Sequence, residues 1–258
     1  MTTLAKIESP RLIVDDFTEN DFPFLMDIFA AMKKVGQSWY NVDADKPATV
    51  QNFLDQALDN KNAAQRETFR MAVRKKPDNG QHNEANELIG YVSLCEIFKH
   101  GNGLPDTGML ITPDYQRGRY GREARLGLMM MAFSMGLEAI YCDIELQNHA
   151  SQSNVRGMGY QQLTHADGSP RTYSIQTLKG TKSVYRFGLK HDDFWNTIPG
   201  LVSDHVTKCG WDPRLSNDFN AAVQGAQTTR PKAITMDIAK AFGPFSVSVH
   251  DSAPTHAP

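Results

Sequence analysis

The segment that most restricts the fold lies near the middle of the chain, where a β-type run at 107–112 leads into a glycine-containing turn. The turn, QRGRYG at 116–121, continues as a helical pattern with Leu126 and Met129 on its apolar side. A strand, a glycine turn and a helix start together leave backbone N–H groups unpaired at the positive end of the helix dipole. Phosphates bind readily at such a place. The sequence therefore predicts an anion site here, in a fold that contains both strands and helices.

Short β-type runs and amphipathic helical patterns alternate along roughly the first 190 residues. Their order indicates one mixed α/β sheet, largely antiparallel, and no repeat. The expected elements are strands at 11–14, 69–73, 88–94, 107–112 and 139–146, a helix capped by Thr18, helices at 49–60 and 150–157, and a closing hairpin of 171–178 and 183–189.

The composition is that of a globular protein, with 258 residues, 40% hydrophobic residues, 22% charged residues and a net charge of −2. The 27 Lys and Arg are balanced by 29 Asp and Glu, so the chain lacks the basic excess of nucleic-acid-binding proteins. The longest nearly apolar run, 126–133, is far shorter than the roughly 20 residues that cross a bilayer. We therefore expect neither a nucleic-acid partner nor a membrane span.

The cysteines and histidines indicate no metal site. Cys95, Cys142 and Cys209 are widely separated and form no CxxC pair, and the eight histidines show no HExxH pattern. The N-terminus, MTTLAKIESPRL, lacks the apolar stretch of a signal peptide. We expect a cytoplasmic protein with reduced thiols and no bound metal.

The hydrophobic patterning weakens after residue 195, which predicts a main domain at 1–195 and an extension at 196–258. The extension contains two short helical patterns, at 218–223 and 234–241, and about ten final residues that we expect to be mobile. With Trp211 and Phe219 as anchors, the extension would cover an acceptor pocket or make a subunit contact, such as a homodimer interface.

Three segments between about residues 10 and 195 resemble the GCN5-related N-acetyltransferases, in particular the branch of the ribosomal-protein N-terminal acetyltransferases. They are the opening PRLIVDDFTENDFPFL, the turn ITPDYQRGRYGREA, and NHASQSNVRGMGY, in which Asn148, Ser151, Gly159 and Tyr160 have the spacing of that branch. The resemblance implies a mixed, mostly antiparallel sheet flanked by helices, with acetyl-CoA as cosubstrate.

The resemblance also implies how the donor binds. The pyrophosphate would lie on N–H groups of the turn, and the pantetheine would extend between the strands near 107–112 and 139–146. A backbone N–H of the first of these strands would hold the thioester carbonyl oxygen. The implied donor-binding residues are Met109, Leu110, Ile111, Gln116, Arg117, Gly118, Arg119, Tyr120, Gly121, Arg122, Asn148 and Ser151.

The turn departs from the family pattern at one position. The family has Gln or Arg, two free residues, Gly, one free residue, and then Gly or Ala, whereas this chain has Arg119 at the central glycine and Gly118 one place early. The Arg119 side chain would either crowd the donor or pair with its phosphates.

Amine acetylation needs a base for the amine and an acid for the departing thiolate. The resemblance implies Asp106 as the base, acting through water, with Glu96 in reserve, although Asp106 in LPDTG is equally well explained as a turn former. Many members have a tyrosine acid at the position of Val155, so the resemblance leaves Ser151 as the candidate acid. Asn148 would form a hydrogen bond with the pantetheine. Both residue types are also common helix N-caps.

We therefore expect an N-acetyltransferase that acts on a primary amine, in a protein N-terminus or a small molecule, by direct transfer. Trp39 and Tyr40 would line the acceptor pocket or hold a loop to the core. Two alternatives stay open: a non-catalytic acyl-CoA-binding module, and an acyltransferase for another donor such as succinyl-CoA, whose carboxylate Arg119 or Arg70 would neutralise.

Overall fold

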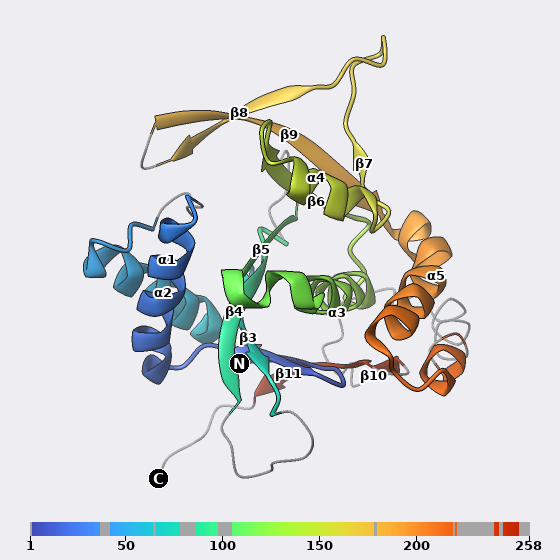
Figure 1. The fold of residues 1–258 in the computed structure, drawn as a ribbon, viewed down its shortest axis with the longest axis horizontal. Coiled ribbons are helices and arrows are strands. Elements are labelled where there is room, and N and C mark those ends of the chain that lie inside the picture. Colours follow the sequence, from blue (N-terminus) through green and yellow to red (C-terminus); the bar gives the residue numbers. More distant parts are fainter. Residues whose placement is uncertain are drawn as a thin grey trace.

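The computed structural model describes residues 2–36, 42–63, 66–77, 86–97, 105–177, 180–218, 220, 240–242 and 245–252. Within these residues one eleven-stranded sheet has the order β10-β11-β1-β2-β3-β4-β5-β6-β9-β7, and β8 pairs with β9 (Figure 1). The strands are β1 (Thr2–Glu8), β2 (Leu12–Asp16), β3 (Phe69–Lys75), β4 (Glu87–Cys95), β5 (Asp106–Ile111), β6 (Ala139–Glu145), β7 (Gln161–Gln162), β8 (Thr172–Thr177), β9 (Gly180–Lys190), β10 (Lys240–Phe242) and β11 (Phe245–Ser252). The helices are α1 (Phe22–Lys34), α2 (Pro47–Asn62), α3 (Tyr120–Ser134), α4 (His149–Arg156) and α5 (His191–Cys209), with 3-10 turns η1 (Glu19–Asp21) and η3 (Pro113–Gly118).

The two faces of the sheet carry separate hydrophobic cores. Helices α1 and α2 cover one face, where Phe29 and Phe53 pack against Tyr91 of β4. Helices α3 and α5 cover the other face, where Phe133 stacks on Phe194 with ring centroids 4.5 Å apart. Because α3 has the sheet on one side and α5 on the other, every one of its residues from 123 to 134 is buried. The mixed, mostly antiparallel sheet flanked by helices confirms the predicted fold class.

The sheet is interrupted between β5 and β6. These two parallel strands share a single ladder pair, Asp106 with Tyr141, whereas β4 and β5 pair along the whole of β5. The Thr107 hydroxyl donates to the Tyr141 carbonyl at 2.8 Å. We call the space beyond this pair the β5–β6 gap, and the pair itself its vertex.

The predicted strands and helices of the first 190 residues are present, with boundaries shifted by a few residues. The prediction missed β1, which pairs with β2 and β11. A helix expected at 234–241 is wrong at its C-terminal end, where residues 240–242 form β10. Residues 249–252, within the end expected to be mobile, pair with β1 as part of β11. Long-range strand pairing, which local patterns do not report, accounts for all three differences.

Helix α5 runs through position 195, where the sequence predicts the end of the main domain. Phe194, Ile198 and Val202 are fully buried in the α3 core, so the residues on both sides of position 195 pack into the same core. Among the described residues, no helix combines the length and the apolar character that a membrane crossing requires.

Candidate active site

The backbone of β5 offers unpaired donors to the β5–β6 gap. The Tyr141 N–H donates to the Pro105 carbonyl at 2.8 Å, which fixes the direction of the odd-numbered peptide groups toward β6. Since successive residues of a strand point their N–H groups to opposite sides, those of Met109 and Ile111 face the gap. Leu110 does not: its backbone faces β4, and its side chain is buried in the α1–α2 core.

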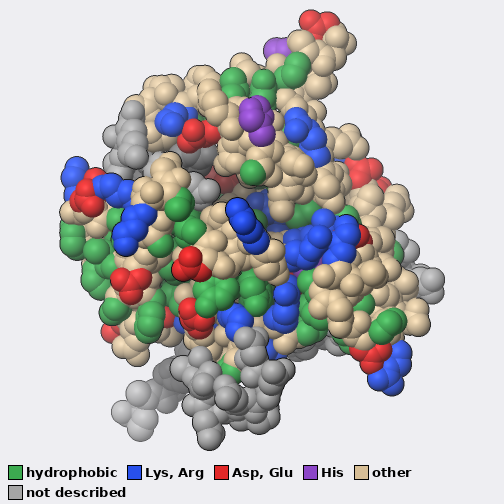
Figure 2. Space-filling model, viewed as in Figure 1, with side chains coloured by type: hydrophobic (Ala, Val, Ile, Leu, Met, Phe, Trp, Pro, Cys, Tyr) green, Lys and Arg blue, Asp and Glu red, His purple; other side chains and the backbone are tan. Residues whose placement is uncertain are grey.

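Asp106 lies at the vertex, on the face of the sheet that α1 and α2 cover, since side chains two and four residues apart in a strand share a face and Leu110 packs there. Asp106 is an exposed residue. Figure 2 shows the surface hollowed in this part of the molecule, between the side of α4 and that of α1 and α2.

The surroundings of Asp106 weaken its acidity. Protein atoms crowd the vertex and remove part of the hydration of the carboxyl group, which is the main reason that its pKa is raised to about 6. The negative charges of Asp143 and Glu96 act in the same direction, and the cations Arg186 and Arg125 oppose them. Asp143 is held by Arg186 through two contacts of 2.8 and 2.7 Å, whereas Asp106 has no ion pair within the described part of the chain. Asp106 can therefore exchange a proton near neutral pH.

The predicted anion site is built by η3 and the first turn of α3. Arg119 ends η3 in the left-handed region, with φ of 62°, and α3 begins at the next residue. The first-turn N–H groups of α3 have no helical partner. Lys and Arg side chains gather over this part of the surface in Figure 2. These donors and charges fit a diphosphate.

Gly118 is required by the packing of the turn. A Cβ there would lie 2.5 Å from the Tyr120 ring, on which the Arg11 guanidinium stacks with its central carbon 4.4 Å from the ring centroid. Tyr115 adds an edge-to-face contact, with centroids 5.7 Å apart. The glycine that stands one place early in the family pattern therefore admits the ring of Tyr120.

The remaining side chains of the turn have different surroundings. Gln116 donates to the Ile111 carbonyl at 3.0 Å and so ties the turn to the end of β5. Arg117 is exposed, and Arg122 pairs with Asp204 of α5 at 3.2 Å. Arg117 and Arg119 are thus directly available to phosphates, while Arg122 would have to share its charge.

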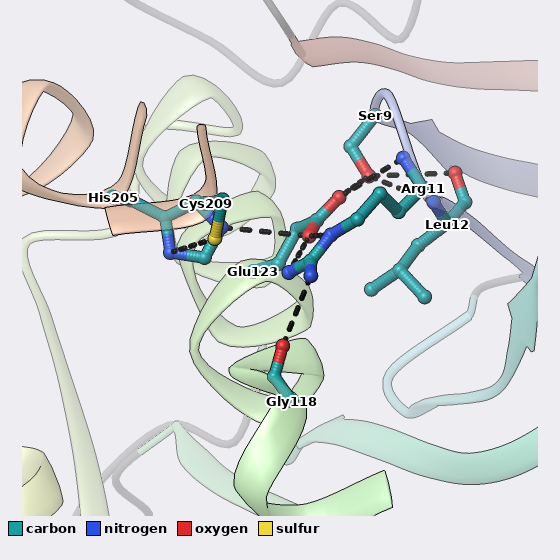
Figure 3. A network of polar contacts seen from close by, with 7 residues as sticks. All are labelled: Ser9, Arg11, Leu12, Gly118, Glu123, His205 and Cys209. Carbon is teal, nitrogen blue, oxygen red and sulfur yellow. Dashed lines mark hydrogen bonds and ion pairs between the residues drawn. The ribbon is translucent and has the colours of Figure 1, made fainter. Parts of the chain in front are cut away.

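A buried carboxylate fixes the turn from below (Figure 3). Glu123, in the first turn of α3, accepts from the Ser9 hydroxyl at 2.6 Å and from the Arg11 Nε at 2.8 Å, and its Oε2 lies 3.4 Å from His205 Nε2. Burial alone would raise the pKa of Glu123, but the contacts with His205 and Arg11 outweigh it and hold that pKa below its usual value.

Arg11 connects this carboxylate to the turn. Its Nη1 donates to the Gly118 carbonyl at 3.0 Å while Nη2 lies 2.6 Å from Glu123. Trp211 follows α5 and packs on the same group, 5.7 Å from the guanidinium carbon and edge-to-face with His205. Of the two anchors predicted in the extension, Trp211 therefore lies beside the turn formed by η3 and the start of α3, which we call the donor turn. Phe219 lies outside the described residues.

Asn148 is the N-cap of α4, and Ser151 lies in the first turn of that helix. The Asn148 side-chain oxygen accepts from the Ser151 backbone N–H at 3.1 Å. Asparagine thus has the N-cap role that it favours, whereas Ser151 contributes only its backbone N–H. Their predicted contacts with the donor remain predictions, as does the role of Trp39 and Tyr40, which lie outside the described residues. Among the residues described, no group of three or more His, Cys, Asp or Glu is placed to hold a metal ion.

The sequence reasoning missed two charged residues of α3, Glu123 and Arg125. Both are buried, with 1% and 5% of their surface exposed. Arg125 stands four residues before Met129, on the apolar side of the predicted helix. The signal in the sequence that could have revealed such a residue is a charged residue within the apolar stripe of a helix, since a buried charge needs a partner.

Replacing Arg119 by Gly should stabilise the folded protein by about 1 kcal/mol, because a side chain in the left-handed region carries strain of that order. The same change should weaken coenzyme A binding by about threefold to tenfold through the loss of a cation at the phosphates. Thermal unfolding and calorimetric titration measure the two effects. Arg117→Gly is the matched control: its residue is not left-handed, so it should lower the melting temperature. A lower melting temperature for both variants would contradict the idea that the left-handed conformation of Arg119 is strained.

Comparisons with known proteins agree with this geometry. The model of the acetyltransferase (GNAT) domain matches residues 11–161, more than half of the chain. A Vibrio cholerae protein described as a ribosomal-protein-serine acetyltransferase is 19% identical, with a TM-score of 0.56 over 72% of this chain and 97% of that one. The GNAT-family acetyltransferase from Bacillus anthracis is 17% identical, with a TM-score of 0.52 over 72% and 99%.

A Vibrio cholerae spermidine N-acetyltransferase in complex with CoA and spermine is 14% identical, with a TM-score of 0.52 over 71% of this chain and 97% of that one. No curated protein matches the chain. The matched domain contains β5, the donor turn, α3 and α4. The resemblance expected from the sequence is thereby confirmed, and the chain belongs to the GCN5-related N-acetyltransferase family, whose members are acetyltransferases.

Proposed function

We propose that this chain transfers the acetyl group of acetyl-CoA to a primary amine at the vertex of the β5–β6 gap, directly and without a covalent enzyme intermediate. One observation carries the proposal: Asp106, with a pKa raised to about 6, lies beside a gap lined by the N–H groups of Met109 and Ile111. A base and an oxyanion donor are thereby close to the same place.

Acetyl-CoA supplies a thioester, whose C–S bond breaks as the C–N bond to the amine forms. Asp106 takes the proton of the amine, through a water molecule, and is mostly ionised at pH 7 because its pKa lies near 6. The Met109 N–H donates to the carbonyl oxygen as negative charge develops on it. Ser151, at the start of α4, returns a proton to the thiolate.

The acceptor is a cationic amine. Asp106 and Asp143 share the face of the sheet on which the acceptor would enter, and Glu96 acts on the same site. Negative charge attracts an ammonium group, and the raised pKa of Asp106 makes its carboxylate a stronger base for the ammonium proton. The names of the similar structures, a ribosomal-protein-serine acetyltransferase and a spermidine N-acetyltransferase, give a protein N-terminus and a polyamine as the two acceptor types to compare.

Calorimetric titration with acetyl-CoA, with dephospho-CoA as control, tests the donor half of the proposal. We expect micromolar binding, followed by thiol release when a polyamine or an N-terminal serine peptide is added. No detectable binding would mean that Arg119 closes the turn, and would leave an interaction module on an acetyltransferase scaffold. Binding without thiol release for any amine would contradict catalysis.

A further inference from the structure

Arg125, in the second turn of α3, is a buried cation that forms no ion pair with any residue that the structure describes. Only 5% of its surface is exposed, and its Nε and Nη1 atoms have no hydrogen-bond partner in the part of the chain that the structure describes. Arg66 makes the contrast: it is fully buried as well, but its guanidinium holds Asp16 with contacts of 2.5 and 3.0 Å. Burying an unpaired charge costs folding free energy, so a chain retains one where a ligand supplies the partner.

The contacts of Arg125 place its guanidinium at the vertex of the β5–β6 gap. It lies 5.8 Å from the centre of the Tyr160 ring, and the Tyr160 hydroxyl lies 3.5 Å from the Thr107 hydroxyl of β5. Its charge acts on Cys142 of β6 and on Asp106 of β5. The guanidinium therefore lies beneath the two strands where they begin to separate.

Arg125 and Asp106 lie on opposite sides of the sheet. Asp106 shares the α1–α2 face with Leu110, whereas Arg125 belongs to α3 and acts on Cys142, which is part of the α3 core. An amine that reaches Asp106 thus enters from one face, and Arg125 closes the gap from the other. A group that meets Arg125 comes from the donor that fills the gap, not from the acceptor.

We propose that Arg125 binds a carboxylate at the far end of the acyl group, so that the enzyme accepts ω-carboxyacyl-CoA donors such as succinyl-CoA in addition to acetyl-CoA. The inference rests on the proposed function, since it uses the same gap and the same transfer. The thioester C–S bond breaks as the C–N bond forms, and the amine proton goes to Asp106. The coenzyme A thiolate leaves with the electron pair of the broken bond and takes a proton from Ser151, while the distal carboxylate remains ionised against Arg125. The Tyr160 hydroxyl, which lies 3.5 Å from the Thr107 hydroxyl, is a further donor to that carboxylate.

Calorimetric titration of the full chain with succinyl-CoA and with acetyl-CoA tests this inference. Wild-type protein should bind succinyl-CoA about 10- to 100-fold more tightly, because a charge-assisted hydrogen bond in a buried site has an effect of that size. In Arg125→Met the ratio of the two affinities should fall to about one, and Arg125→Lys should keep part of it. Arg156→Met is the matched control, an exposed arginine stacked on Phe187 at 5.0 Å, and should keep the wild-type ratio.

Thermal unfolding shows whether the variant folds. Arg125→Met should melt no lower than the wild type, since it removes an unpaired buried charge. Equal affinities of the wild type for both donors would overturn the inference and leave the proposed function intact. Arg125→Met could instead lose turnover equally with both donors while it keeps the wild-type ratio of the two affinities. That result would mean that Arg125 stabilises the departing thiolate, and it would overturn the inference as well. Binding of neither donor would overturn the proposed function too.

Discussion

Replacement of Asp106 by Asn is expected to lower kcat for acetyl transfer by about 10²- to 10⁴-fold, the usual contribution of a positioned base. The amide has the shape of the carboxyl group but accepts no proton. Donor binding should change little, because the proposed phosphate site lies at the far end of the β5–β6 gap, on the first turn of α3. Steady-state thiol release and calorimetric titration with acetyl-CoA measure the two quantities separately.

The pH dependence gives this prediction a second readout. Because the pKa of Asp106 is raised to about 6, the carboxyl group is protonated below that pH and cannot act as a base. The kcat of the wild type should therefore rise through about pH 6, and Asp106→Asn should lack this rise. Full activity in Asp106→Asn would mean that Asp106 is not the base, and Glu96 would become the candidate for that role.

Asp143→Asn is the matched control for Asp106. It removes a negative charge that raises the pKa of Asp106, and it frees Arg186, which lowers that pKa. Both effects act in one direction, so the rise in kcat should move to lower pH while the activity at pH 7 is kept. A loss as large as that of Asp106→Asn would contradict the assignment of the base.

Replacement of Glu123 by Gln is expected to lower the free energy of unfolding by about 3–5 kcal/mol, the cost of breaking a buried charge pair on one side. Arg11 would keep its charge but lose its carboxylate, and the Ser9 and His205 contacts would be weakened. Urea unfolding at pH 7 measures the loss. Glu145→Gln, which breaks the partly exposed pair with Lys182, should cost less than about 1 kcal/mol.

The contribution of Glu123 also depends on pH. Its pKa is lower in the folded protein than the usual 4.5 of a glutamate, so folding favours the ionised form. This stabilisation is complete above pH 4.5 and is lost as the pH falls further, when the carboxylate takes up a proton. The difference between wild type and Glu123→Gln should therefore shrink in acid. A difference that stays constant from pH 7 to pH 3 would contradict the charge pair as its cause.

The sequence predicted the parts of the site that follow from local chemistry. The strand, the glycine turn and the start of α3 follow one another within fifteen residues, and the periodicity of apolar residues and the conformational preferences of glycine and proline report them directly. The anion site at the turn was predicted in this way, whereas Asp106 was implied by the resemblance to the family.

The rest depends on contacts between distant parts of the chain. Glu123 contacts Ser9 and His205, which lie 114 and 82 residues away from it in the sequence. A buried charge in a helical pattern indicates that some partner exists but does not identify it. The pairing of β1 with β11 and the direction of the Leu110 peptide are likewise set by neighbouring strands, and no local pattern in the sequence reports them.

The packing of Tyr120 has a thermodynamic consequence for the donor. Its ring is enclosed by Arg11 and Tyr115, and the helix that it begins is buried on every side. The N–H groups of the turn are thereby fixed before any phosphate arrives, so little conformational entropy is left to lose on binding. The affinity for the diphosphate is then set by hydrogen bonds and charge, because binding costs no free energy for ordering the turn.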